Sequence, residues 1–118
     1  MDLDGFFAGR PFARAVHDRV AALIAAIGPA EARVTKSQVS FRRRRGFAYV
    51  WIPGRYLAHP AAEVVLSVAL PRHIRSPRWK EVVRPAATTW MHHLEVRSLD
   101  ELDPEVAGWL REAYAAAG

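Results

Sequence analysis

The sequence contains no cysteine, and this absence excludes several kinds of site at once. Disulfide bonds, thiolate metal ligands and cysteine nucleophiles need a residue that none of the 118 positions supplies. The chain also has no apolar run that approaches the roughly 20 residues of a membrane-spanning helix. Its first residues, Met1 to Asp4, lack the basic start and apolar middle of a signal peptide. We therefore expect a cytoplasmic protein with no membrane partner.

Acidic residues are missing from a long stretch of the chain, and basic residues are concentrated there. Residues 32–62 contain seven Arg and Lys residues and no acid, and four of the seven are the consecutive Arg42 to Arg45. Residues 98–118 hold five acids and a single basic residue, Arg111. The net charge of +5 is thus unevenly distributed, which favours an anionic partner for the basic half. The scarcity of carboxylates in that half argues against a nuclease that holds Mg²⁺.

Two segments show the apolar spacing of three and four residues that is typical of an amphipathic helix. The first begins near Pro11, which suits a first helical turn, and it ends at Gly28-Pro29. The second begins at Asp103-Pro104 and continues to the end of the chain. The sequence therefore predicts a long helix near each terminus.

Between these helices the apolar period changes to two, the pattern of strands. It predicts strands over residues 31–35, 38–43, 47–52, 63–70 and 88–97. Gly46 is expected to close the hairpin between the second and third strands with a positive φ. Ser76-Pro77 resembles a helix cap followed by a first-turn proline, so we expect a short helix over residues 78–83 that Pro85 ends.

Together these elements predict an α+β fold for a single domain over residues 1–118. We expect a largely antiparallel sheet of about five strands, with the N- and C-terminal helices packed on one face and a short helix before the last strand. The strand over residues 47–52 is apolar on both faces and is expected in the interior of the sheet. The second face is then open, but alternation does not decide whether Tyr49 and Trp51 point toward it.

Four segments carry a family resemblance: residues 34–41 (VTKSQVSF), 76–83 (SPRWKEVV), 92–97 (HHLEVR) and 109–114 (WLREAY). They resemble a small, uncharacterised bacterial family of unknown function, some of whose larger relatives are labelled predicted transport proteins. The resemblance covers nearly the whole chain, which implies one complete domain. It implies no catalytic residue.

No motif signals catalysis, a metal or a cofactor. The serines include no G-x-S-x-G elbow, and the glycines form neither a P-loop nor a dinucleotide fingerprint. The adjacent His92 and His93 point to opposite faces of a strand, with His92 expected in the core. His93 and Glu95 share a face, but no third metal ligand is placed by the sequence. We therefore favour a non-catalytic protein, with an enzyme that lacks a recognisable motif as an alternative.

Two binding hypotheses remain. In the first, the basic hairpin and the open face bind an anionic partner such as nucleic acid, with arginines on phosphates and aromatic rings on bases. In the second, a pocket beside the sheet binds an acidic metabolite, with Lys36 or His93 on its acid group and aromatic rings around the rest. The residues expected to converge in this pocket are Lys36, Gln38, Tyr49, Trp51 and His93. A solvated hairpin and core tryptophans are the plain structural alternative to both. The candidate binding residues are Lys36, Gln38, Arg42, Arg43, Arg44, Arg45, Tyr49, Trp51, His93 and Arg97.

Overall fold

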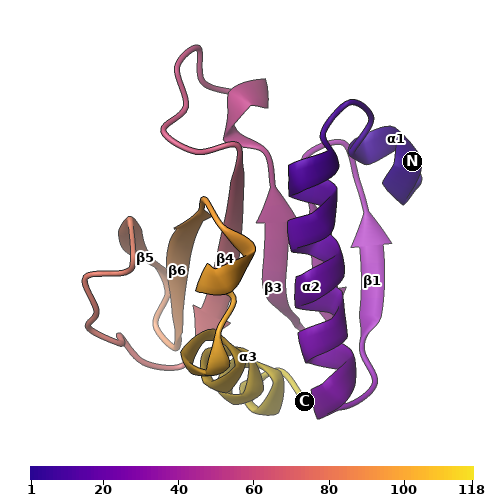
Figure 1. Ribbon diagram of the computed structural model, residues 1–118. Coiled ribbons are helices and arrows are strands. Elements are labelled where there is room, and N and C mark those ends of the chain that lie inside the picture. The colour runs from indigo at the N-terminus through magenta and orange to yellow at the C-terminus, as the bar shows by residue number, and fades with distance from the viewer.

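The computed structural model describes all 118 residues, which form three α-helices and six strands (Figure 1). The helices are α1 (Leu3–Phe6), α2 (Pro11–Ile27) and α3 (Pro104–Ala116). The strands are β1 (Glu31–Val34), β2 (Val39–Arg42), β3 (Gly46–Trp51), β4 (Val64–Leu70), β5 (Glu81–Ala86) and β6 (Thr89–Val96). Two short 3-10 helices, η1 (Pro53–Arg55) and η2 (Leu99–Glu101), lie in the connections. The predicted starts of α2 and α3 are confirmed, and no helix is long and apolar enough to cross a lipid bilayer.

All six strands pair antiparallel in one open sheet, in the order β1-β2-β3-β4-β6-β5. This arrangement confirms the α+β class and the interior position of β3. The predicted number of about five strands is wrong, because the sheet has a sixth strand at its edge.

The sixth strand, β5, is the segment from which the sequence predicted a short helix. The expected helix over residues 78–83 is absent, and residues 81–86 pair with β6 instead. Ser76 does cap a turn, since its Oγ accepts the backbone N–H of Arg78 at 3.2 Å, but no helix follows. Val82 and Val83 are β-branched and favour a strand. Pro85 is compatible with this strand because the strand lies at the edge of the sheet.

A bulge in β3 changes the alternation of its side chains. Phe41 of β2 pairs with Ala48, whereas the next residue, Arg42, pairs with Gly46. Phe47 is therefore an extra residue in β3, and a bulge of this kind places two successive side chains on one side of the sheet. Both Phe47 and Ala48 are fully buried.

The bulge decides which aromatic residues of β3 face the helices. Phe47 packs edge to face against Tyr114 of α3, with 5.5 Å between ring centroids. Tyr49 and Trp51 consequently project from the other face. Gly46 has no positive φ, so that expectation was wrong. Its lack of a side chain matters for another reason, because a Cβ at this position would overlap the hydroxyl group of Tyr49.

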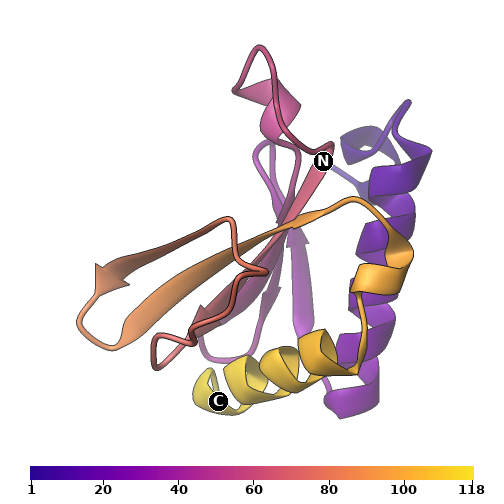
Figure 2. The ribbon, with the colours of Figure 1, turned by 60° about the vertical axis from the view of Figure 1, so that its left-hand side comes forward.

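The helices α2 and α3 lie on the same side of the sheet (Figure 2). Val16 and Val20 of α2 and Leu110 of α3 belong to one buried cluster with Val50 and Leu66 of the sheet. Apolar burial on this scale is the main source of stability for a domain of this size. The opposite side of the sheet has no helix across it, so its side chains face solvent or the connecting loops.

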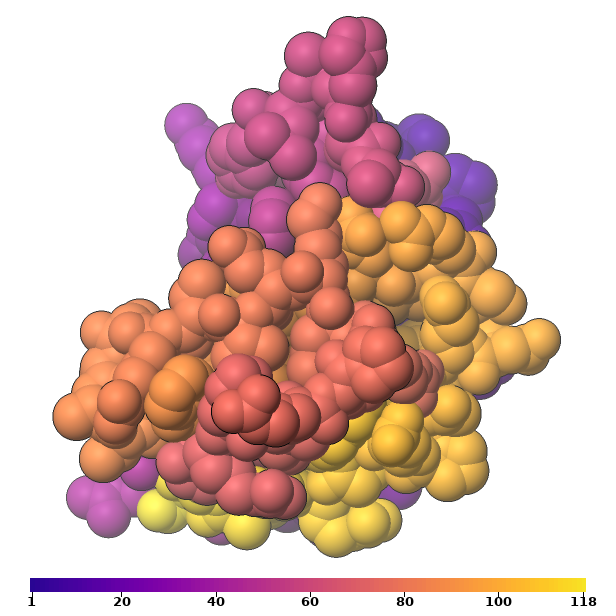
Figure 3. Space-filling model, turned by 90° about the vertical axis from the view of Figure 1, so that its left-hand side faces the viewer, coloured from indigo at the N-terminus to yellow at the C-terminus, as the bar shows by residue number.

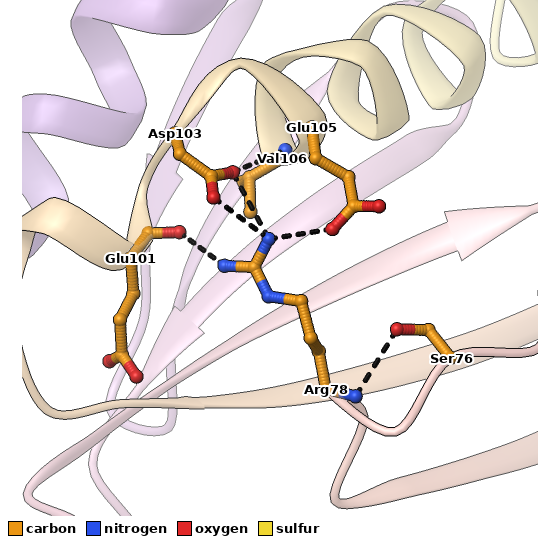
Figure 4. A network of polar contacts seen from close by, with 6 residues as sticks. All are labelled: Ser76, Arg78, Glu101, Asp103, Glu105 and Val106. Atoms are coloured by element: carbon orange, nitrogen blue, oxygen red, sulfur yellow. Dashed lines mark hydrogen bonds and ion pairs between the residues drawn. The ribbon is translucent and has the colours of Figure 1, made fainter.

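Arg78 connects the segment before β5 to the start of α3 (Figure 4). Its guanidinium donates to the carboxylates of Asp103 and Glu105 at 3.0 and 2.8 Å, and to the carbonyl oxygen of Glu101 at 2.7 Å. Asp103 also caps the N-terminus of α3. This network fixes the segment from which Lys80 reaches the open face.

Candidate ligand-binding pocket

Polar side chains form a row across four strands of the open face. Tyr49 of β3 pairs with Ser67 of β4, Ser67 pairs with His93 of β6, and His93 pairs with Glu81 of β5. The Cβ atoms of such neighbours lie about 4.5–5.5 Å apart. Trp51 is two residues from Tyr49 along β3, so it projects from the same face. An aromatic wall therefore stands beside a polar row.

Trp51, Ser67 and His93 form a chain of hydrogen bonds. The indole Nε1–H of Trp51 donates to Ser67 Oγ at 2.8 Å, and Ser67 Oγ lies 2.6 Å from His93 Nδ1. Because an indole nitrogen only donates, the hydroxyl oxygen accepts from it. Toward His93 Nδ1 the hydroxyl group donates in one imidazole tautomer and accepts in the other. When the hydroxyl group donates to Nδ1, the neutral imidazole carries its hydrogen on Nε2. This chain occupies Nδ1 of His93 and leaves Nε2 as the ring nitrogen without a partner in the protein.

A partly enclosed pocket of about 290 Å³ lies beside this chain. Loop residues 53–61 and Val65 form one wall with the indole of Trp51, and residues of β5 and β6 form the polar wall. Figure 3 shows the loop projecting above the β5–β6 hairpin, and the pocket lies between these two parts. Its lining residues are Trp51, Pro53, Leu57, Ala61, Val65, Lys80, Glu81, His93 and Glu95.

The loop that forms the apolar wall is anchored to the N-terminal segment. Arg55 donates to the carbonyl oxygen of Phe6 and lies over its ring, 4.2 Å from the centroid. The Glu63 carboxylate accepts the backbone N–H of Ala13 at 2.9 Å, at the N-terminus of α2, where a negative charge is favoured. Leu57, between these anchors, is 52% exposed. The pocket thus has a fixed rim with an exposed apolar side chain at its mouth.

Two cations hold Glu95 on the polar wall. Lys80 Nζ lies 3.2 Å from one carboxylate oxygen, and Arg97 Nη2 lies 2.9 Å from the other. Burial alone raises the pKa of Glu95, but these hydrogen bonds outweigh it and the pKa is lowered. Burial lowers the pKa of His93, against the smaller opposing effect of the Glu81 carboxylate. At neutral pH the pocket therefore contains a neutral imidazole and an ionised Glu95.

The Ser67–His93 pair lacks the accessibility of a catalytic nucleophile. Ser67 is only 2% exposed and does not line the pocket. A nucleophile has to reach the reacting atom of a substrate, and this hydroxyl already bonds Trp51 and His93. The structure also contains no group of three or more His, Asp or Glu side chains that is placed to hold a metal ion. Ser67 instead orients the two side chains on either side of it.

The basic hairpin contacts the C-terminal end of α3. The guanidinium groups of Arg43 and Arg45 donate to the carbonyl oxygens of Tyr114 and Ala116 at 2.9 and 2.8 Å. The last carbonyl groups of a helix have no partner within it and carry a partial negative charge, so cations stabilise this end. Two of the four hairpin arginines therefore have a structural role. The side chains of the other two take part in no ion pair within the protein.

Of the five residues expected to converge in a pocket, the structure brings Trp51 and His93 together, whereas Lys36 and Gln38 lie outside the pocket. Of the ten candidate residues, only Trp51 and His93 line the pocket. Tyr49 lies beside them on the open face, where burial raises its pKa. Arg97 acts on the pocket through Glu95.

The remaining candidate residues lie elsewhere. Lys36 and Gln38 belong to the turn between β1 and β2 and do not line the pocket. Arg42 to Arg45 precede β3, whereas Trp51 is its last residue. At about 3.3 Å per residue, the hairpin and the indole are separated by roughly 20 Å. The basic hairpin and the aromatic pocket are therefore two distinct surfaces.

Lys80 and Glu81 line the pocket but were not among the candidate residues. Both fell in the segment assigned to a helix, so no strand register connected them to His93. Pairing of residues 81–86 with β6 places Glu81 directly opposite His93. The available signal was the pair of β-branched residues Val82 and Val83, which favour a strand.

The fold and the open face define this protein as an α+β domain with an antiparallel sheet that is covered by helices on one side. The chain belongs to the family DUF5655, a domain of unknown function, which matches residues 3–117. This match agrees with the resemblance to an uncharacterised family and extends over nearly the whole chain. No curated protein and no solved structure matches the chain.

Proposed function

We propose that this domain binds a small molecule in the pocket on the open face and does not catalyse a reaction on it. The observation that carries the proposal is a partly enclosed space of about 290 Å³ into which an indole, an imidazole and an ammonium group converge. Known ligand pockets measure about 300–1,000 Å³, combine apolar walls with a few polar groups, and are largely formed before binding.

The two walls of the pocket suit different parts of a ligand. Trp51, Leu57 and Val65 offer apolar surface to a flat body. Lys80 and His93 offer hydrogen-bond donors at the opposite wall. Because Glu81 and Glu95 also line this wall, its formal charge is not strongly positive. This balance favours a ligand with mixed polar groups over a purely acidic one.

A thermal-shift screen of a fragment library tests the proposal. A ligand that binds only the folded state at a hundred times its Kd stabilises that state by about 2.7 kcal/mol, which raises the Tm by several degrees. We expect hits whose shift is lost in His93→Ala and kept in His73→Ala, since His73 is a surface histidine outside the pocket. A library without hits, or hits that ignore His93→Ala, would contradict the proposal.

A second candidate function is binding of an anionic partner, such as nucleic acid, by the basic hairpin. Two observations favour it. Arg42 and Arg44 form no ion pair within the protein, and the neighbouring Arg43 and Arg45 are exposed on the surface. The docking of Arg43 and Arg45 on α3 leaves fewer free guanidinium groups than the sequence suggested. Retention of labelled oligonucleotides at low salt tests this candidate separately from the pocket.

A further inference from the structure

The polar groups of the pocket that lack partners indicate what its ligand has to offer. Ser67 occupies Nδ1 of His93, so Nε2 is the free ring nitrogen, and it presents an N–H in the tautomer in which Ser67 donates to Nδ1. Lys80 uses one ammonium hydrogen on Glu95 and has two left. Glu81 makes no side-chain hydrogen bond or ion pair in the protein, and its carboxylate has two acceptor oxygens. The pocket therefore has two donor groups with unused hydrogens, His93 and Lys80, beside one unused carboxylate.

These groups are neighbours on one wall. Glu81 and His93 are directly paired residues of β5 and β6, so their side chains stand next to each other on the open face. Lys80 precedes Glu81, and its backbone N–H donates to the carbonyl oxygen of His93 at 2.8 Å. The indole of Trp51 meets the His93 ring edge to face, with 6.1 Å between centroids. A flat ligand that packs against the indole thus places its edge at the donors and the carboxylate.

We propose that the pocket recognises a planar heterocycle whose edge carries a carbonyl group followed by two N–H groups, as in guanine. This inference rests on the proposed function of the pocket. A carbonyl oxygen has two lone pairs and accepts from both His93 and Lys80. Two parallel N–H groups donate to the two oxygens of Glu81, the arrangement in which charge-assisted hydrogen bonds are strongest.

Other ligand edges satisfy fewer of these groups. The adenine edge accepts through a ring nitrogen with one lone pair, so it leaves one donor unused. A hypoxanthine edge has the carbonyl group and one N–H, so it leaves one oxygen of Glu81 unpaired. A simple aromatic carboxylate places a negative charge beside Glu81 and donates nothing to it, and like charges at this distance repel.

Isothermal titration calorimetry with the full chain at neutral pH, using guanosine, inosine, adenosine and 2-naphthoate, tests this order. We expect guanosine to bind at least about tenfold more tightly than inosine, since one hydrogen bond to a charged group is worth about 1.5–3 kcal/mol. Adenosine and 2-naphthoate should bind more weakly still. Glu81→Gln should weaken guanosine binding at least about tenfold. Glu31→Gln, a control in the edge strand at the opposite side of the sheet, should leave it unchanged.

Any other outcome would overturn the guanine-type edge, and the different outcomes can be told apart. Equal affinity for adenosine and guanosine would show that stacking alone drives binding. Binding of 2-naphthoate alone, or fragment hits in the pocket without any nucleoside binding, would overturn the guanine-type edge but leave the pocket as a binding site. The absence of both nucleoside binding and fragment hits would overturn the proposed function as well.

Discussion

Replacement of Ser67 by alanine removes the middle of the hydrogen-bond chain beneath the pocket. The indole N–H of Trp51 loses its acceptor, and His93 Nδ1 loses its hydrogen-bond partner. Each buried polar group that is left unsatisfied costs about 1–3 kcal/mol. Because His93 lines the pocket and is reached by water there, we expect the sum to fall near the lower bound. The predicted loss in the free energy of unfolding is about 2 kcal/mol.

Ser40→Ala provides a matched control for this prediction. Ser40 is 6% exposed and pairs with Tyr49 on the same open face, but it does not belong to the hydrogen-bond chain. Its replacement should change the free energy of unfolding by no more than about 0.5 kcal/mol. Equilibrium unfolding in guanidinium chloride measures both values. Equal losses for the two variants would refute the role that we assign to the Trp51–Ser67–His93 chain.

Three further predictions concern acidity, the helix end and the basic hairpin. Burial lowers the pKa of His92 and of His93, so the unfolded state binds more protons than the folded state below the unfolded pKa of about 6.5. Stability measured by unfolding should therefore fall as the pH drops from about 7 to 5, by up to about 1.4 kcal/mol per pH unit for each histidine, and His92→Gln should make the fall less steep. The double replacement of Arg43 and Arg45 by alanine should lower the free energy of unfolding by about 1 kcal/mol, because α3 loses two hydrogen bonds at its C-terminus. Thermal unfolding measures this loss, and a loss no larger than that of Arg44→Ala would show that these hydrogen bonds do not stabilise the helix end. If the hairpin binds single-stranded nucleic acid, the logarithm of its affinity should fall with the logarithm of salt concentration by about 0.7 for each phosphate contact, and replacement of the hairpin arginines by serine should flatten this slope.

The sequence predicted the elements that have a strong period of their own. The helix α2 follows from apolar residues at three- and four-residue spacing between Pro11 and Gly28, and its observed bounds agree. The interior position of β3 follows from a strand that is apolar on both faces. These features depend on local patterns, which a single sequence contains.

Features that depend on pairing between distant residues were not predictable in the same way. The strand β5 was mistaken for a helix because Ser76-Pro77 resembles a helix start, whereas its pairing with β6 decides its structure. The bulge places Phe47 and Tyr49 on opposite faces of the sheet. It depends on the register between β2 and β3, which alternation alone does not predict.

The candidate site shows the same division. The sequence indicated His93 because alternation places it on the open face of its strand, and Trp51 because it is an aromatic residue in a central strand. Lys80 and Glu81 join them only through the register between β5 and β6. The pocket itself needs the loop before β4 as its second wall, and no local pattern in the sequence places that loop over the sheet.

The most direct test of the account is the NMR signal of the Trp51 indole N–H during titration with a pocket ligand. Comparison with Trp51→Phe assigns this signal among the four tryptophan indoles of the chain. We predict a saturable shift of the Trp51 signal with guanosine or a fragment hit. The signals of Trp79 and Trp109 should be unchanged, because these rings pack against each other outside the pocket, with 4.2 Å between ring centroids. A bound ligand that leaves the Trp51 signal in place, or that shifts the Trp79 and Trp109 signals instead, would contradict the assignment of the open-face pocket as the binding site.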